Sequence, residues 1–516
     1  MCRPVSPRPV VCRPVSPRPR TGEGSGVRED AVTGAASYNT VMRRPLRLYT
    51  LLALTALLPV VMRLPAHVTA SGGVRPHWVA AWTASPQGPF PVGHTFDEPS
   101  LRVVFRGAAA ADQTLRLIVH GAAGGSLVRV RLSNVFGKRP LVIGAAYVGL
   151  RLYGAALVPG SNRRLTFDKR PTVVIPPGRE VYSDPTPLDV PAERDLAVSL
   201  YLPFRTPAIT WHASSFTTSY ATAQEMGDDA AAEDGAAFAY TMTSWFWLDG
   251  VDVYSSDTAG AVVALGDSIT DGWVSTVNGD NRWPDVLARR LLDLPPAHRL
   301  SVVDAGIAGN MVESSRIPCR PCGPPAVTRL TRDVLDQAGV RAVILFEGAN
   351  DLGHGASAAR VIAGLRVIAA RVHARGLPIF AATILPYEGS GYMPLGRRQD
   401  GLGPGVRAGA RGTFNPIVRE RAREEVNTFI RTSRTFDGVI DLDALLRDPH
   451  DPQRLDPRYD SGDHLHPNAL GLQRIGDAIP INALEQSVYR RERMESPPTQ
   501  PSHGRYAGSR AAPGAR

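Results

Sequence analysis

The chain contains few cysteines and almost no lysine. Among its 516 residues there are four cysteines, at positions 2, 12, 319 and 322, and two lysines, Lys138 and Lys169. The bias towards arginine, together with abundant alanine, glycine and proline, indicates a GC-rich genome and not a particular function. In a cytosolic protein the spacing of Cys319-Arg320-Pro321-Cys322 would suggest a redox motif or half of a zinc site. Both are disfavoured, because export is predicted and cleavage of the signal peptide would leave no second cysteine pair.

The sequence also lacks a long apolar run near its start. Leu48–Val61 is apolar but spans only about 14 residues and contains Pro59, whereas a helix needs about 20 residues to cross a bilayer. Basic residues precede this stretch and a small-residue motif follows it: Arg43, Arg44, Arg47 and Val68-Thr69-Ala70. This is the pattern of a secretory signal peptide at residues 42–70. We therefore expect secretion and no stable membrane anchor, with an N-terminal anchor as the alternative.

The first 41 residues differ from the rest of the chain. Cys2–Pro9 is repeated at Cys12–Pro19, and the segment is rich in proline and arginine. Such a composition cannot bury a core and predicts disorder. We interpret residues 1–41 as the product of a start codon placed too early, with Met42 as the true start.

Positive charge is concentrated at the two ends of the chain. The formal net charge is +10, of which residues 1–70 carry +7 and residues 487–516 carry +4. The part between them therefore has a net charge of −1. Proteins that bind nucleic acid place clustered basic side chains against phosphates. We expect no nucleic-acid partner, because the basic excess does not belong to the folded body.

Residues 75–254 have the pattern of an all-β domain. Apolar and polar residues alternate in Leu127–Leu132 and Leu196–Leu202, and turn clusters separate such segments. This predicts a sandwich or a jelly roll. The aromatic residues Trp211 and Trp245–Trp247 have two interpretations, packing in the core of this domain or stacking against sugar rings.

Residues 255–486 have the pattern of an α/β domain. Apolar runs predict strands at Val262–Leu265, Ser301–Asp304, Ala342–Phe346, Pro378–Leu385 and Val439–Asp441. Amphipathic segments predict helices at Pro284–Leu294, Ala326–Gln337, Ser357–Arg375, Pro416–Thr432 and Ala469–Leu484. This alternation predicts a parallel sheet covered by helices on both faces.

Two segments interrupt or follow this pattern. Residues 389–413 are rich in glycine and arginine, and a connection of this length either forms a lid or rim at a functional site or is disordered. Both possibilities stay open. The tail, residues 487–516, is rich in Pro, Ser and Gly and is predicted to be disordered.

Reactive side chains follow the predicted strands. Gly266-Asp267-Ser268 follows the first strand, Gly309 lies after the second, Asn350 lies after the third, and Asp463-His464-Leu465-His466 precedes the last helix. The carboxyl ends of parallel strands meet at one edge of a sheet, where open α/β folds build their sites. A serine on a strand-to-helix turn has an exposed hydroxyl group. These fragments therefore predict a site for acyl transfer.

Each residue of that site has an expected role. Ser268 is the predicted nucleophile, His466 the base that takes its proton, and Asp463 the carboxylate that orients the imidazole. The backbone N–H groups of Ser268 and Gly309 and the side-chain amide of Asn350 are the predicted donors to the oxyanion. No cofactor is expected.

These fragments resemble the sequence blocks of the GDSL/SGNH hydrolase family. Ser268, Gly309 and Asn350 match the serine, glycine and asparagine of blocks I, II and III, and Asp463 and His466 match the Asp-x-x-His of block V. The resemblance covers about residues 258–486 and implies a three-layer α/β/α fold, no cofactor and hydrolysis of carboxylic esters through a serine acyl-enzyme. Residues 75–254 more loosely resemble the N-terminal domain of a secreted actinobacterial subgroup, through Trp78–Trp82 and Arg131–Asn134.

Neighbouring residues have supporting roles or alternatives. His464 directly follows Asp463 and should point away from it, whereas Asp267 and Asp351 are expected to cap or brace turns. A metal site made of Asp463, His464 and His466 is disfavoured, since no other His or Cys cluster completes it.

Two further segments flank the site in sequence. Cys319 and Cys322 are expected to form a small structural disulfide, because export is predicted. The stretch Arg282-Trp283-Pro284 either lines the pocket or packs where a helix starts. The lengthened loop around the two cysteines bears on substrate choice and not on the chemistry.

We expect a secreted serine esterase that removes short acyl groups from carbohydrate. A lipase or lysophospholipase-type lipid esterase is the first alternative, and a non-catalytic carbohydrate-binding protein is the second. Hydrolysis of phosphodiesters or sulfate esters is disfavoured, since the metal ligands that such chemistry usually uses are missing from the motifs. The expected partners are thus small-molecule or polysaccharide esters.

Overall fold

The computed structural model describes residues 74–94, 98–207, 209–313, 319–390 and 416–495. Residues 1–41, the predicted signal peptide at 42–70, positions 391–413 of the predicted lid or rim, and the end of the tail from 496 lie outside these described residues. Within the described ranges no helix is both long and apolar enough to cross a membrane.

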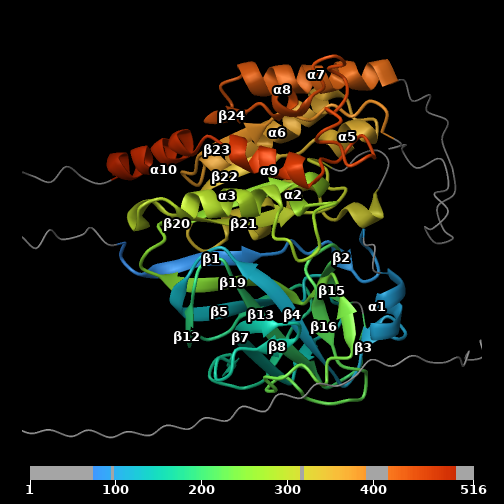
Figure 1. Cartoon of the computed structure of the whole chain (residues 1–516), viewed down its shortest axis with the longest axis vertical. Coiled ribbons are helices and arrows are strands. Elements are labelled where there is room, and N and C mark those ends of the chain that lie inside the picture. The colour runs from blue at the N-terminus through green and yellow to red at the C-terminus, as the bar shows by residue number, and fades with distance from the viewer. Residues whose placement is uncertain (1–73, 95–97, 208, 314–318, 391–415, 496–516) are drawn as a thin grey trace, which may run out of the picture. The chain divides into compact units, whose positions relative to one another are not determined.

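The part of the chain between residues 77 and 255 is rich in β-strands, as predicted (Figure 1). One antiparallel sheet has the order β1 (His77–Thr83), β19 (Leu248–Ser255), β5 (Gly125–Ser133), β11 (Glu180–Tyr182), with β12 (Thr186–Val190) also on β5. A second has the order β17 (Tyr240–Met242), β16 (Ser219–Ala221), β4 (Gln113–Gly121), β13 (Arg194–Leu202), β7 (Ala145–Tyr153), β8 (Ala156–Leu157), with β9 (Arg163–Arg164) on β7.

Smaller elements complete this part. They are β2 (Gly88–Pro89), α1 (Glu98–Val104), β3 (Ala109–Ala110), β6 (Leu141–Ile143), β10 (Val173–Ile175), β14 (Thr206–Pro207), β15 (Thr210–His212) and β18 (Trp245–Phe246). Alternate side chains of both large sheets, such as Leu117 of β4 and Val130 of β5, are fully buried in one apolar core. The predicted jelly-roll connectivity stays a prediction.

The aromatic residues of this part belong to its core. Trp211, Trp245, Phe246 and Trp247 have at most 2% of their surface exposed. Phe246 stacks on Trp211 with ring centroids 5.7 Å apart. The interpretation of these rings as a sugar-stacking surface is therefore wrong, because no ring face is left for a ligand.

The remaining part has the predicted parallel sheet. Its strand order is β21 (Leu300–Gly306), β20 (Gly260–Gly266), β22 (Val340–Phe346), β23 (Ile379–Ala382), β24 (Gly438–Ile440). The helices are α2 (Ser268–Asp271), α3 (Trp283–Leu292), α4 (Ala326–Leu330), α5 (Ala349–Gly353), α6 (Ala358–His373), α7 (Pro416–Thr432), α8 (Leu442–Leu446), α9 (Ala469–Ala478) and α10 (Ile481–Glu495). Short 3₁₀ turns occur at Pro296–His298 and Arg320–Cys322.

The two faces of this sheet bury different sets of side chains. On β20, Val263 and Leu265 pack with α4, α6 and α7, whereas Val262 and Ala264 pack with α3, α9 and α10. Strands buried on both faces are continuously apolar, which is why Val262–Leu265 signals a strand so clearly. The three-layer arrangement of helix, sheet and helix is confirmed.

Three predicted elements differ in detail. The helix expected at Ala326–Gln337 is α-helical only to Leu330 and continues as a π-helical turn over Thr331–Leu335. The last predicted helix is divided at Pro480, whose ring cannot continue a helix, into α9 and α10. The predicted disordered tail is wrong for residues 487–495, because Val488 is 4% exposed and anchors α10 in the core.

The β-rich part and the α/β part share one core. Val79 of β1 and Val303 of β21 belong to the same buried cluster. The backbone N–H of Ala80 donates to Ala338 O at 2.9 Å, and the Ser301 hydroxyl donates to Ala80 O at 2.7 Å. Strand β1 therefore packs against β21, the edge strand of the parallel sheet (Figure 1).

Candidate active site

The first three sequence motifs lie at one edge of the parallel sheet. Gly266 at the end of β20 pairs in register with Gly306 of β21 and with Phe346 of β22. The Ile307 N–H donates to Gly266 O at 3.1 Å and joins the first two loops directly. The predicted convergence of these loops is thus what the structure shows.

Ser268 is the first residue of the short helix α2. The Asp267 side chain caps this helix by accepting a hydrogen bond from Ile269 N at 3.0 Å, and Gly272, in the left-handed conformation, ends it. Asp267 therefore caps the turn as predicted. The tight turn leaves the serine at the mouth of the sheet edge, with 8% of its surface exposed.

Ser268, His466 and Asp463 form one chain of hydrogen bonds. Ser268 Oγ lies 2.8 Å from His466 Nε2, and His466 Nδ1 lies 2.6 Å from Asp463 Oδ2. A carboxylate oxygen can only accept here, so Nδ1 carries the proton and Nε2 is free to take the serine proton. The three side chains occupy the positions that the sequence predicted, and their catalytic role stays a prediction.

The spacing of three residues between Asp463 and His466 has a local cause. Asp463 Oδ1 accepts hydrogen bonds from Leu465 N at 2.9 Å and from His466 N at 2.8 Å. This turn brings the imidazole back over the carboxylate. Burial raises the pKa of Asp463, but the hydrogen bond and the charge of His466 outweigh burial and hold that pKa below its usual range.

His464 points elsewhere, as expected. Its Nδ1 lies 2.6 Å from Asp460 Oδ2, and its backbone φ of 61° turns the chain away.

Two side-chain groups of the described residues have atoms close enough together to hold a metal ion. These are His94, Cys319 and Cys322, whose cysteines are joined as a disulfide, and His120, Asp195 and Asp280.

Gly309 occupies a position that only glycine fits. Its φ is 80°, and an added Cβ would lie 2.9 Å from both Cys322 Sγ and His94 Nε2. Gly309 is partly exposed. Within the described residues neither the Gly309 N–H nor the Ser268 N–H donates a hydrogen bond, so both donors are available to a ligand.

Asn350 lies beside the same loops but is already engaged. Its amide donates to Asn310 O at 2.9 Å and to Asp267 Oδ2 at 3.2 Å. Asn350 thus links the ends of β20, β21 and β22, a contact that its sequence motif does not reveal.

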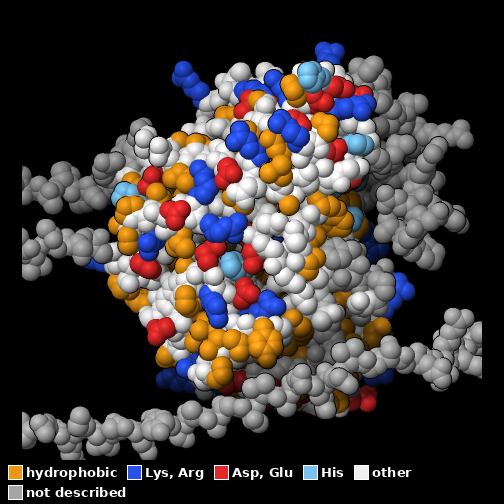
Figure 2. Space-filling model, viewed as in Figure 1, with side chains coloured by type: hydrophobic (Ala, Val, Ile, Leu, Met, Phe, Trp, Pro, Cys, Tyr) orange, Lys and Arg blue, Asp and Glu red, His pale blue; other side chains and the backbone are white. Residues whose placement is uncertain are grey.

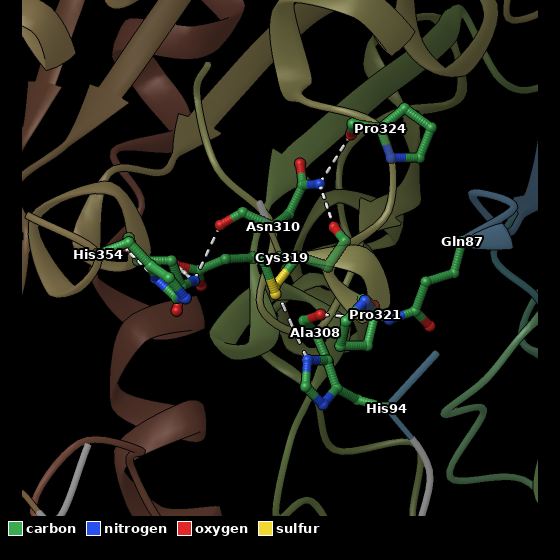
Figure 3. Close-up of a disulfide and its surroundings, with 11 residues drawn as sticks. Gln87, His94, Ala308, Asn310, Cys319, Pro321, Pro324 and His354 are labelled. Atoms are coloured by element: carbon green, nitrogen blue, oxygen red, sulfur yellow. Dashed lines mark hydrogen bonds between the residues drawn. A yellow bond between two sulfur atoms is a disulfide. The ribbon is translucent and has the colours of Figure 1, made fainter. Parts of the chain in front are cut away.

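Cys319 and Cys322 are joined as a disulfide, which confirms the prediction. This disulfide loop is tied to the loop that carries Gly309 (Figure 3). The Asn310 amide donates to Cys322 O at 2.8 Å, and His94 Nε2 lies 3.8 Å from Cys322 Sγ (Figure 3). The loop after β21 is thereby braced from outside.

Several carboxyl groups are buried beneath the site. Burial raises the pKa of Asp267 to about 6 and those of Asp304 and Asp351 to about 7. Asp351 accepts hydrogen bonds from Val312 N at 2.9 Å and from Glu313 N at 3.2 Å. Asp351 therefore braces the loop after β21, as predicted.

Arg329 of α4 is a positioning residue that sequence reasoning missed. Its guanidinium donates to Gly266 O at 3.0 Å, to Ala305 O at 2.6 Å and to Asn310 Oδ1 at 3.0 Å. The side chain is completely buried. It therefore clamps the ends of β20 and β21, and one more arginine in an amphipathic helix carries no sequence signal for such a role.

Aromatic side chains lie next to the histidine and at the start of α3. The Trp273 ring lies 6.2 Å from the His466 ring, and the Phe216 ring of the β-rich part lies 6.1 Å from Trp273. Trp283 is buried at the start of α3, and Arg282 lies over the ring of Trp245. The stretch at 282–284 therefore packs where a helix starts, one of its two predicted uses.

Basic and acidic side chains are intermingled on the face that Figure 2 shows. Ion pairs of the described residues include Arg151 with Asp195 at 2.9 Å and Arg431 with Asp441 at 2.6 Å. This mixture is what a net charge near zero for the middle of the chain leads us to expect.

Comparisons with known proteins give one family. Residues 264–474 match the GDSL-like Lipase/Acylhydrolase family. No curated protein matches the chain.

Among solved structures, a carbohydrate acetylesterase from Sinorhizobium meliloti is 14% identical, with 43% of this chain and 99% of that chain covered and a TM-score of 0.31. An aryl esterase from M. smegmatis is 15% identical with the same coverage and TM-score. A GDSL-like lipase from Bacteroides thetaiotaomicron is 16% identical, with 44% and 88% covered and a TM-score of 0.29.

Proposed function

Residues 264–474 belong to the GDSL-like lipase/acylhydrolase family, and from this premise we propose that the chain is a secreted serine esterase that removes short acyl groups from carbohydrate. Membership of that family makes it a carboxylic ester hydrolase. The observation that carries the finer proposal is the unbroken hydrogen-bond chain from Ser268 through His466 to Asp463. The signal-peptide pattern at residues 42–70 supports secretion.

The geometry supports a two-step acyl transfer. His466 Nε2 takes the Ser268 proton as Oγ forms a bond to the ester carbonyl carbon, and the carbonyl π electrons move to oxygen. The tetrahedral intermediate then expels the alcohol, which receives the proton from His466. Water, deprotonated in turn by His466, attacks the acyl-enzyme and releases the acid and Ser268. Asp463 stabilises the imidazolium in both steps.

The oxyanion is assigned to three donors. The N–H groups of Ser268 and Gly309 are available, and the Asn350 amide can replace its 3.2 Å bond to Asp267. Burial raises the pKa of Asp267 to about 6, so this neighbour is partly protonated near pH 6 and competes less for the amide. Each such donor contributes about 2.7–4 kcal/mol to the transition state.

Substrate choice is argued from the rim of the site. Trp273 is half-buried at the rim, with its ring 6.2 Å from the His466 ring, and aromatic side chains at such rims favour a carbohydrate substrate. The exposed Val274 and Val277, each 40% accessible, lie on the same loop and favour the alternative, a lipid acyl chain.

We also propose that residues 75–254 form a β-sandwich. Alternate side chains along the strands of the two large sheets are buried in one core, which supports this arrangement.

A chain-length series tests the substrate proposal. We expect kcat/KM for p-nitrophenyl acetate to exceed that for the palmitate by at least about tenfold, because a site built for short acyl groups holds a long chain in the reacting position only at a steric cost. Release of acetate from acetylated xylan, measured beside release of fatty acid from a lysophospholipid, is the second arm. A preference for palmitate and the lysophospholipid would establish the lipid-esterase alternative.

Replacement of Asn350 by alanine tests the third oxyanion donor. We expect Asn350→Ala to lower kcat for p-nitrophenyl acetate by about 10²- to 10³-fold with little change in KM, the usual effect of losing one such donor. Asn427→Ala is the matched control, since Asn427 is also a buried amide that holds a loop, through Ile384. If both variants kept the wild-type kcat, Asn350 would be a purely structural link.

A further inference from the structure

We propose that the N-terminal β-rich part sets the orientation of the Gly309 N–H, with Gln87 and His212 as positioning residues. The inference rests on the esterase function proposed above and gives the β-rich part a role in it. Both residues are almost fully buried, with 2% and 5% of their surface exposed. Gln87 contacts the loop after β21 directly, and His212 acts on it through Asp271. Neither is assigned to the site by its sequence motif.

Gln87 fixes the peptide plane that contains the Gly309 N–H. Its side-chain amide, between β1 and β2, donates to Ala308 O at 3.3 Å and to Pro321 O at 2.6 Å (Figure 3). The Ala308–Gly309 peptide is trans, so its C=O and N–H point in opposite directions. Holding Ala308 O towards Gln87 therefore directs the Gly309 N–H away from the β-rich part.

His212 holds the other side of Ala308 through a carboxylate. The Ala308 N–H donates to Asp271 Oδ2 at 2.7 Å, and His212 Nε2 lies 3.0 Å from Asp271 Oδ1. Asp271 is the last residue of α2, the helix that begins with Ser268. The Asp271 carboxylate thus connects α2, the loop after β21 that carries Gly309, and β15.

The His212 ring is a cation in this arrangement. Its Nδ1 lies 2.9 Å from Ser85 O and its Nε2 lies 3.0 Å from Asp271 Oδ1, and since both partners accept, both nitrogens donate. Burial by itself lowers the pKa of His212, Asp271 raises it, and the sum is a raised pKa despite the nearby Arg282. The Trp245 ring, 5.4 Å away, covers the imidazole.

Because the His212 ring is a cation, its contact with Asp271 depends on pH in a defined direction. A histidine whose pKa is raised by folding keeps its charged contacts at low pH and loses them as the pH rises through the folded-state pKa. The groups that face it are Asp271 from α2 and Arg282 at the start of α3. Above that pH one ring nitrogen no longer donates, and the hold on Asp271 weakens.

The test replaces the His212 imidazole with a phenyl ring, which is also flat and aromatic but has no nitrogen to donate a hydrogen bond. We expect His212→Phe to lower kcat for p-nitrophenyl acetate by about 10- to 100-fold with KM within about twofold, because a displaced donor acts only on the transition state. We expect Gln87→Leu to change kcat in the same direction. His373→Phe is the matched control, since His373 forms a similar pair with Asp437 at 2.8 Å in the α/β part.

A second readout separates positioning from stability. A trifluoromethyl ketone adds Ser268 Oγ to its carbonyl carbon, passes the serine proton to His466 and leaves an oxyanion. For His212→Phe its inhibition constant should rise by the factor lost in kcat/KM, in folded protein whose circular dichroism matches the wild type. An unchanged kcat and inhibition constant would overturn the inference while the wild type still hydrolyses esters. A wild type inactive on every ester would overturn the proposed function instead.

Discussion

Replacing Ser268 with alanine is expected to lower kcat/KM for p-nitrophenyl acetate by about 10⁴- to 10⁶-fold. The reason is that Oγ, 2.8 Å from His466 Nε2, is the atom that forms the covalent acyl bond in the proposed mechanism. Because the alanine removes one oxygen at an 8% exposed position, the thermal midpoint should change little. Initial rates and thermal unfolding, measured on the same preparation, check both statements.

The control for this variant lies just after the end of α2. Ser275 is also buried, at 7% exposure, and within the described residues its hydroxyl has no hydrogen-bond partner. Ser275→Ala should therefore keep the wild-type kcat/KM. Equal rates for Ser268→Ala and wild type would remove the serine mechanism altogether, and the rival reading of a binding protein without turnover would take its place.

A covalent probe gives the same prediction independently of turnover. A fluorophosphonate should add its phosphonyl group to Ser268 Oγ of the wild type with loss of fluoride, and intact mass should rise by one adduct. His466→Ala should slow this labelling, because no base then takes the hydroxyl proton. Labelling of Ser268→Ala to the same extent would place the nucleophile elsewhere.

The positions of the candidate site residues could be predicted, because each follows a strand or a turn that its neighbouring residues specify. Val262–Leu265 is apolar at every position, as a strand buried on both faces must be, and Gly266-Asp267-Ser268 ends it. The Asp463–His466 spacing is a local turn, so its geometry depends on neighbouring residues alone. Local causes of this kind can be read from a single sequence.

The supporting residues could not be predicted, because their partners are distant in the chain. His212 meets Asp271 across 59 positions, and Gln87 meets Ala308 across 221. Trp211-His212 stands out in the sequence as an aromatic pair, but nothing in the sequence places His212 beside Asp271. The packing of the β-rich part on the α/β part brings Gln87 to Ala308 and His212 to Asp271.

The boundaries of helices show the same limit. Pro480 divides the last helix, yet a proline at that place is also compatible with a helix that simply ends. Val488 of α10 is buried in the same cluster as side chains of β20 and β22, so this part of the chain packs on the sheet. Polar composition alone therefore misassigned these residues as tail.

Arg329 should matter more for stability than any other residue beneath the site. It is enclosed with Glu347 at 3.6 Å and Asp333 at 3.3 Å, while its remaining donors hold the strand-end carbonyl groups. Burial raises the pKa of Glu347 well above its usual range even with this partner present. Without the guanidinium, those carbonyl groups lose their donors and two buried carboxyl groups lose a counter-charge.

We expect Arg329→Met to lower the free energy of unfolding by about 3–5 kcal/mol, the usual effect of removing one partner of a buried ion pair. Urea titration followed by tryptophan fluorescence measures it. Arg375→Met is the matched control, since Arg375 pairs with Asp336 at 3.1 Å in an exposed position and should contribute less than about 1 kcal/mol.

The two variants together decide what Arg329 does. A loss of stability confined to Arg329→Met, with kcat reduced even in the folded protein, is expected if the guanidinium holds both the core and the strand ends in place. If Arg329→Met unfolded within about 1 kcal/mol of the wild type, the buried carboxyl groups would have to be neutral already, and protonated Glu347 would need no counter-charge. The clamp at Gly266 and Ala305 would then have to come from backbone contacts alone.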